Sequence, residues 1–246
     1  MTGTPIVLLN AFPVDRAQWE GLLSVLGSDV RGDVITFDMP GIGEMPLPDE
    51  EPGLELIADA AVLAMREATG EDAAHWIGCS MGGYVAMAVA ERHPDAVAGL
   101  GLIATKAVAD TEEAAAKRLA TADAVEHRDA VEDPAAMAEG LIGTEGPRRE
   151  ELVEWVARNI GRHRGDGIAW GQRAMAARPD RLEVLRAIDG PAVVIAGESD
   201  AVTPREDVDA MADALGVATT VIPGVGHLAA FEDPAAVAAA LAPLLR

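Results

Sequence analysis

Residues 73–90 read AAHWIGCSMGGYVAMAVA, and this stretch places a serine between two different hydrophobic patterns. The residues before Ser80 form a short apolar run that is typical of a buried strand, and those after it continue as a longer, helix-like run. Gly78 and Gly82 flank the serine in the pattern Gly-x-Ser-x-Gly. A serine at such a tight strand-to-helix turn presents its hydroxyl away from the backbone. The stretch predicts a serine nucleophile, and its partners can be sought elsewhere in the chain.

The alternation of short apolar runs and helical patterns continues along the chain. Six runs are typical of strands, at residues 6–9, 34–37, 73–78, 97–104, 192–196 and 219–222. Helical patterns between them cover about 15–27, 53–69, 81–92, 205–215 and 234–245. This alternation favours an α/β fold with a mostly parallel, doubly wound sheet of about six strands and helices on both faces.

The alternation stops in the middle of the chain. Between residues 106 and 187 no run is typical of a strand, and helical pieces cover about 111–129, 134–142, 147–160 and 167–178. We therefore expect a core formed by residues 1–105 and 188–246, with residues 106–187 as a helical insertion. The insertion should cover the site and supply part of a substrate pocket. The large apolar candidates for that pocket are Trp155, Trp170, Met137 and Leu141.

Composition limits the classes of partner. The 246 residues carry a net charge of −22, which disfavours nucleic acid and anionic membrane surfaces. The single cysteine, Cys79, excludes an internal disulfide and a cysteine-based zinc site. The first residues lack the basic and apolar segments of a signal peptide, so we expect a cytoplasmic protein. We expect a small-molecule substrate, no metal and no cofactor, and the sequence leaves monomer and dimer open.

A serine hydroxyl needs a histidine to accept its proton and an acid to orient that histidine. In this architecture the order along the chain should be serine, acid, histidine, each just past the end of a strand. Asp200 follows the apolar run at 192–196, and His227 follows the run at 219–222. We therefore predict Ser80, Asp200 and His227 as a catalytic triad. Glu198 is a rival for the acid, but the shorter side chain of Asp200 lies deeper in the loop.

The oxyanion that develops on the substrate needs backbone N–H donors. Met81 follows the nucleophile and opens a helix, so its N–H is one candidate. The second candidate is the N–H of Phe12, in the loop after the first strand.

These segments together resemble the α/β-hydrolase superfamily, nearly from end to end. The segments that carry the resemblance are residues 8–13, 38–43, 78–83, 197–200 and 226–227. The resemblance implies the nucleophile, acid, base and oxyanion roles given above to the same residues. It also implies that the insertion forms a cap. The chain is most similar to the small cap-bearing esterases, enol-lactonases and cofactor-free haloperoxidases of that superfamily.

Three features depart from the family pattern. The first loop has Asn10-Ala11 where the family usually has His-Gly, and segment 41–45 lacks the serine that is usual there. The first strand begins close to the start of the sequence, so we expect the family's N-terminal antiparallel hairpin to be missing.

The expected reaction is hydrolysis of a small or medium carboxylic ester or lactone through an acyl-enzyme. Two alternatives stay open. The same triad can carry out carbon–carbon or amide hydrolysis or perhydrolysis, because specificity lies in pocket contacts. Some members of the superfamily are instead small-molecule sensors with little turnover.

Overall fold

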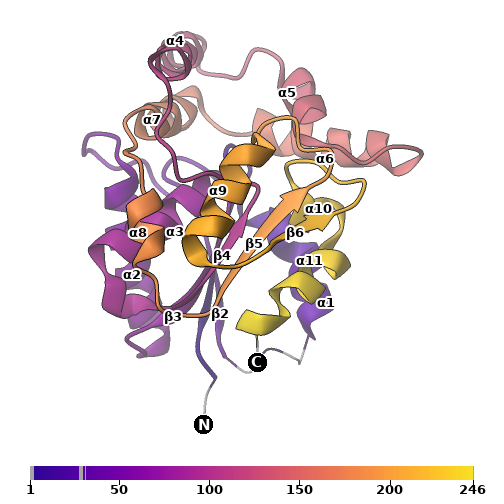
Figure 1. Cartoon of the computed structure of the whole chain (residues 1–246). Coiled ribbons are helices and arrows are strands. Elements are labelled where there is room, and N and C mark those ends of the chain that lie inside the picture. The colour runs from indigo at the N-terminus through magenta and orange to yellow at the C-terminus, as the bar shows by residue number, and fades with distance from the viewer. Residues whose placement is uncertain (1–2, 28–29, 31, 246) are drawn as a thin grey trace.

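A computed structural model describes residues 3–27, 30 and 32–245 of the chain. Six strands form one sheet in the order β2-β1-β3-β4-β5-β6, and each neighbouring pair is parallel (Figure 1). Their bounds are β1 (Ile6–Leu9), β2 (Val34–Phe37), β3 (Ala74–Cys79), β4 (Val97–Ile103), β5 (Ala192–Gly197) and β6 (Thr219–Ile222). The predicted α/β fold with a parallel, doubly wound sheet is confirmed. No antiparallel pair occurs among the strands of the described residues.

Helices cover both faces of this sheet (Figure 1). One face carries α2 (Leu54–Thr69), α3 (Met81–Arg92), α8 (Leu182–Arg186) and α9 (Arg205–Leu215), and the other carries α1 (Glu20–Leu26), α10 (Ala229–Glu232) and α11 (Pro234–Leu241). Side chains of β1 alternate between two buried clusters, with Val7 and Leu9 in one and Ile6 and Leu8 in the other. This alternation follows from the two-residue period of a strand and explains why β1 is apolar throughout.

Four further helices lie above the edge of the sheet at which the strands end (Figure 1). They are α4 (Glu112–Arg128), α5 (Pro134–Leu141), α6 (Arg148–Gly161) and α7 (Gly165–Ala176). We propose that these four helices form the cap expected from the sequence. The fifth helix between β4 and β5, α8, packs instead beside α3 and α9 on the core.

Local sequence signals explain several helix ends. Asp133 and Asp233 each accept a hydrogen bond from the backbone N–H three residues later, and each precedes a proline that opens a helix. This pairing of an acidic cap with a first-turn proline satisfies the free donors of a helix start. At the other end, α2 stops at Gly70, which adopts a left-handed conformation with φ 72°.

The structure refines the predicted boundaries by a few residues. The helix expected over 15–27 is a 3-10 turn, η1 (Arg16–Trp19), followed by α1. The C-terminal helix is likewise divided into α11 and η4 (Ala242–Leu244), and η3 (Pro94–Ala96) precedes β4. The sequence pattern did not indicate α8 and α10, which have 5 and 4 residues. Within the described residues, no helix combines the length and the apolar character needed to cross a membrane.

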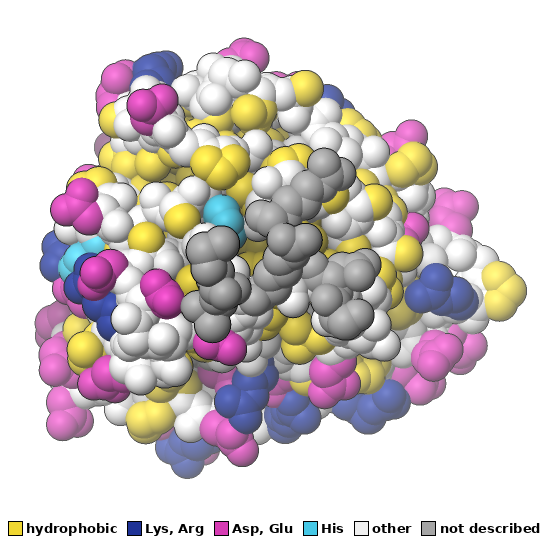
Figure 2. Space-filling model, turned by 90° about the horizontal axis from the view of Figure 1, so that it is seen from below, with side chains coloured by type: hydrophobic (Ala, Val, Ile, Leu, Met, Phe, Trp, Pro, Cys, Tyr) yellow, Lys and Arg dark blue, Asp and Glu magenta, His cyan; other side chains and the backbone are white. Residues whose placement is uncertain are grey.

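The acidic surplus is dispersed rather than gathered on one patch of the face opposite the cap. In the view from below, acidic and basic side chains are intermixed around the rim (Figure 2). Many carboxylates are paired locally, as Asp59 is with Arg92 and His93. The charge of this face therefore indicates no distinct binding surface.

Candidate active site

Ser80 occupies a strained turn between β3 and α3. Its backbone has φ 52° and ψ −114°, a conformation that residues other than glycine rarely adopt. The Ser80 N–H donates to the Ile103 carbonyl at 2.9 Å, and the Thr105 hydroxyl donates to the Ser80 carbonyl at 2.7 Å. Backbone strain of this kind persists only where the surroundings impose it, and it concentrates at functional sites.

The two glycines of the motif are required by close packing. A Cβ on Gly78 would overlap the backbone of Gly82, and a Cβ on Gly82 would overlap the carbonyl of Leu9. The start of α3 therefore lies directly against the ends of β1 and β3. This packing sets the serine at the edge of the sheet and leaves it 9% exposed.

His227 and Asp200 form a buried pair at the same edge. The ring Nδ1 of His227 lies 3.2 Å and 3.1 Å from the two carboxylate oxygens of Asp200. An ionised carboxylate only accepts hydrogen bonds, so Nδ1 carries the proton in this pair and Nε2 is left as the basic nitrogen. The two side chains are only 2% and 4% exposed.

The loop after β5 fixes the orientation of Asp200. Its Oδ1 accepts hydrogen bonds from the N–H groups of Val202 at 2.8 Å and Thr203 at 3.2 Å. Burial by itself would raise the pKa of Asp200, but the hydrogen bond from His227 and the two backbone N–H groups outweigh it and lower the pKa. The carboxylate is therefore ionised at neutral pH.

The strand order brings the three predicted triad residues to one edge of the sheet. Ser80 follows β3, Asp200 follows β5 and His227 follows β6, and the carboxyl ends of parallel strands share an edge. The thiol of Cys79 also contacts the His227 carbonyl oxygen at 3.7 Å, which joins the serine turn to the histidine loop. Within the described residues, no hydrogen bond joins the Ser80 hydroxyl to the His227 ring. Such bonds often tighten only when substrate is bound.

Cys79 is fully buried, and this burial raises the pKa of its thiol. It packs as a small apolar side chain.

The two predicted oxyanion donors come from neighbouring segments, because a Cβ on Gly82 would overlap the carbonyls of Leu9 and Asn10. Met81 is the first residue of α3, so its N–H has no acceptor within the helix. Phe12 lies in the loop after β1, and its ring packs so closely against Gly171 of α7 that a Cβ there would overlap it. In the part of the chain that the structure describes, neither N–H donates to another residue.

Asn10 and Ala11 stabilise this loop by hydrogen bonds of their own. The Asn10 side-chain amide donates to the Val14 carbonyl, and the Ala11 N–H donates to Gln18 Oε1 at 2.9 Å. The Val14 N–H closes the turn on the Ala11 carbonyl at 3.1 Å. The residues that replace the usual His-Gly thus still hold a compact turn before the cap.

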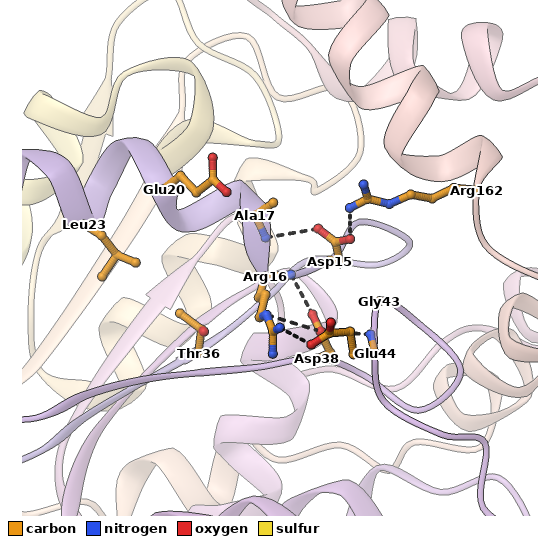
Figure 3. Close-up of a pocket in the computed structure, with 10 residues that line it drawn as sticks. All are labelled: Asp15, Arg16, Ala17, Glu20, Leu23, Thr36, Asp38, Gly43, Glu44 and Arg162. Atoms are coloured by element: carbon orange, nitrogen blue, oxygen red, sulfur yellow. Dashed lines mark hydrogen bonds and ion pairs between the residues drawn. The ribbon is translucent and has the colours of Figure 1, made fainter.

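A polar cluster behind this loop joins the end of α6 to the loop after β1 (Figure 3). Asp15 accepts hydrogen bonds from Arg162, from Asn159 Nδ2 at 2.9 Å and from the Ala17 N–H at 3.0 Å. The Asp15 N–H in turn donates to Asn159 Oδ1 at 3.2 Å. Asp15, Ala17 and Arg162 line a surface cavity of about 480 Å³, in which Arg16 also pairs with Asp38 and Glu44. Because Asp15, Arg16, Asp38, Glu44 and Arg162 already pair with one another, we assign this cavity no ligand.

The predicted pocket residues lie at different places on α5, α6 and α7. The Trp170 indole donates to the Glu50 carbonyl at 3.3 Å, while Trp155 stacks on Phe231 of α10 with ring centroids 4.4 Å apart. Met137 lines a groove between α4 and α5. The fourth residue, Leu141, lies next to the predicted base, because its carbonyl accepts the backbone N–H of His227 at 3.0 Å.

Sequence reasoning missed one residue of this region. Glu232 is 1% exposed, and its carboxylate accepts backbone hydrogen bonds from the histidine loop and from the cap. The available signal was an acidic residue that ends the apolar segment after His227, two positions before Pro234. Among the described residues, no group of three or more His, Cys, Asp or Glu side chains is placed to hold a metal ion.

Comparisons with known proteins show which proteins the chain resembles as a whole. A solved thermophilic esterase from Thermogutta terrifontis is 32% identical, with a TM-score of 0.90 over 98% of this chain and 89% of that one. A 3-oxoadipate enol-lactonase from Acinetobacter baylyi is 25% identical over 93% of this chain and 84% of its own length.

A longer relative is the dihydrolipoyllysine-residue acetyltransferase component of an acetoin cleaving system from Pseudomonas putida. It is 30% identical over 94% of this chain, and the chain spans only 60% of its length. The family model of the alpha/beta hydrolase fold matches residues 4–234. The chain therefore belongs to the α/β-hydrolase family.

Proposed function

We propose that this protein hydrolyses small or medium carboxylic esters or lactones through an acyl-enzyme. The observation that carries the proposal is the buried His227–Asp200 pair, at the edge of the sheet where Ser80 occupies a strained turn. The likeness to an esterase and to an enol-lactonase supports the same class of bond.

In the proposed reaction, Ser80 Oγ attacks the carbonyl carbon and its proton passes to His227 Nε2. The N–H groups of Phe12 and Met81 donate hydrogen bonds to the oxyanion of the tetrahedral intermediate. When this intermediate collapses, the bond to the alcohol oxygen breaks, and the leaving alcohol takes the proton from Nε2.

Water then attacks the acyl-enzyme and gives one proton to Nε2. The second collapse releases the carboxylic acid and returns that proton to Ser80. Throughout, the Asp200 carboxylate stabilises the imidazolium and keeps the ring in one tautomer. The substrate, in this proposal, is a small molecule that enters beneath the cap.

Replacement of the nucleophile tests the proposal. We expect Ser80→Ala to lower kcat on p-nitrophenyl butyrate by about 10⁶-fold, because the attacking oxygen is lost. Ser24→Ala, an exposed serine on α1, is the matched control and should retain wild-type activity. Equal activity of Ser80→Ala and the control would contradict the assignment.

Substrate size tests the role of the cap. We expect p-nitrophenyl acetate, butyrate and hexanoate to give higher kcat/KM than the laurate and palmitate esters, because the cap covers the edge of the sheet. A maximum on the longest chains would contradict a substrate of small or medium size.

A further inference from the structure

The loop that carries His227 is bonded to the inserted segment as well as to the core. The His227 N–H donates to the Leu141 carbonyl at the end of α5 at 3.0 Å. A second bridge runs through Glu232 of α10, which lies in the core beneath the α5–α6 segment (Figure 1). Both contacts join the predicted base to residues that come from the cap.

Both oxygens of the Glu232 carboxylate accept hydrogen bonds in this bridge. Its Oε1 accepts the N–H of Gly226, the residue just before His227, at 2.9 Å. Its Oε2 accepts three hydrogen bonds from the connection between α5 and α6: from the Gly143 N–H at 3.0 Å, from the Thr144 N–H at 2.7 Å and from the Thr144 hydroxyl at 2.8 Å. Each oxygen therefore serves a different segment of the chain.

Burial explains why a carboxylate is needed there. Glu232 is only 1% exposed, and the donors that face its carboxylate are three backbone N–H groups and the Thr144 hydroxyl. A charged acceptor makes stronger hydrogen bonds to N–H groups than a neutral one, and an N–H left without an acceptor in the interior is costly. A carboxamide of the same shape can accept on one side only, so one of the two segments would face an NH₂ group.

The two segments also fit each other closely. A Cβ on Gly143 would lie 2.5 Å from the Gly226 nitrogen, and a Cβ on Gly226 would overlap the Gly143 backbone. A Cβ on Gly197, at the end of β5, would overlap the Gly226 carbonyl. The histidine loop is thus enclosed between the cap connection and the strand that leads to Asp200.

We propose that Glu232 is a positioning residue, which sets the His227 ring by bonding the histidine loop to the cap. This inference rests on the proposed function, because it assigns His227 the role of base. In addition, the position of the His227 ring depends on the connection between α5 and α6. Loosening that connection should displace the imidazole from Asp200 and Ser80 without changing any group that touches substrate.

Glu232→Gln is the direct test. We expect kcat on p-nitrophenyl butyrate to fall by about 10²-fold, the typical cost of a small misplacement of a catalytic group. KM should stay within about twofold, since substrate binding is not altered. Glu198→Gln is the matched control, because Glu198 also accepts an N–H of this loop, from Gly224 at 2.9 Å, but has no bond to the cap. The control should retain wild-type kcat.

A measurement without substrate separates this inference from the proposed reaction. The Nδ1 proton of His227, held between the ring and Asp200, should give a low-field proton NMR signal that is lost in His227→Gln. We expect this signal to broaden or shift in Glu232→Gln and to be unchanged in Glu198→Gln. If the wild-type protein hydrolysed no ester, the NMR comparison would still decide the role of Glu232.

Gly143→Ala provides a second route if Glu232→Gln does not fold. Its Cβ pushes the cap connection away from the histidine loop without altering any charge, and we expect the same loss of kcat and the same change of the signal. Wild-type kcat and an unchanged signal in the folded variants would overturn the proposal. Equal losses in Glu232→Gln and Glu198→Gln would also overturn it, because the effect would not depend on the cap.

Discussion

Two carboxylates stand two positions apart after β5, and the structure gives them different partners. Asp200 faces the His227 ring, with 3.1 Å between its Oδ2 and Nδ1. Glu198 is exposed and accepts the Gly224 N–H at 2.9 Å. The geometry therefore favours Asp200 as the acid of the proposed triad.

This difference predicts opposite results for two similar substitutions. We expect Asp200→Asn to lower kcat by about 10⁴-fold, because an amide can donate to Nδ1 and so stabilise the wrong imidazole tautomer. Glu198→Gln should have no such effect. Steady-state kinetics on p-nitrophenyl butyrate measures both, and a larger loss in Glu198→Gln would reverse the assignment.

At the level of single residues, the sequence could propose Ser80, Asp200 and His227 because each follows a strand-like run in a fixed order. The structure brings them to one edge, and their catalytic roles remain a prediction. Glu232 and the Leu141 carbonyl could not be found in this way. The Leu141 carbonyl accepts from His227, and Glu232 accepts from Thr144. Both contacts join segments that are far apart in the chain, and no local pattern encodes such pairs.

Local sequence signals indicate long helices but not very short ones. The sequence indicated the long helices α2 and α3 within a residue, since their apolar pattern continues over several turns. It missed α8 and α10, because a helix of one turn is unstable alone and forms only through its tertiary contacts. Similarly, Asp15 starts a 3-10 turn before α1, which the sequence alone did not distinguish from one helix.

The contact between α6 and the loop after β1 predicts a stability effect. Asp15→Ala removes the acceptor of Asn159 Nδ2 and of the Ala17 N–H, and we expect a loss of about 2–3 kcal/mol in the free energy of unfolding. The exposed guanidinium of Arg162 adds little to this value. Asp209→Asn, which breaks an exposed surface pair with Arg205, should cost much less than Asp15→Ala. Urea titration of both variants measures the difference.

This stability effect should depend on pH in a stated direction. Burial alone raises the pKa of Asp15, but the hydrogen bonds from Asn159, Arg162 and Ala17 outweigh burial and lower it below its ordinary value of 3.8. The ionised carboxylate is thus favoured in the folded state, and its contribution is complete above that value and lost as the pH falls through the lowered pKa. The difference between the wild type and Asp15→Ala should therefore persist at neutral pH and shrink in acid. A difference that grows in acid would contradict this account.

In the whole molecule, alternating strands and helices made the layered sheet predictable from sequence, and the break in that alternation indicated the inserted helices. The placement of those helices was less predictable. Four of them lie over the edge where the strands end, while α8 packs on the core (Figure 1). Where each of these helices lies depends on the tertiary contacts that its faces make in the folded protein. The division into a core and a cap at residues 106–187 remains a proposal.

Covalent labelling of the intact protein tests the central claim most directly. A fluorophosphonate reacts with a serine whose proton is removed by a neighbouring base, and it needs no knowledge of the natural substrate. We expect intact-mass spectrometry to show one adduct per chain and peptide mapping to place it on Ser80, with no labelling of Ser80→Ala or His227→Gln. An unlabelled wild-type protein, or an adduct on another residue with Ser80 unmodified, would contradict the account.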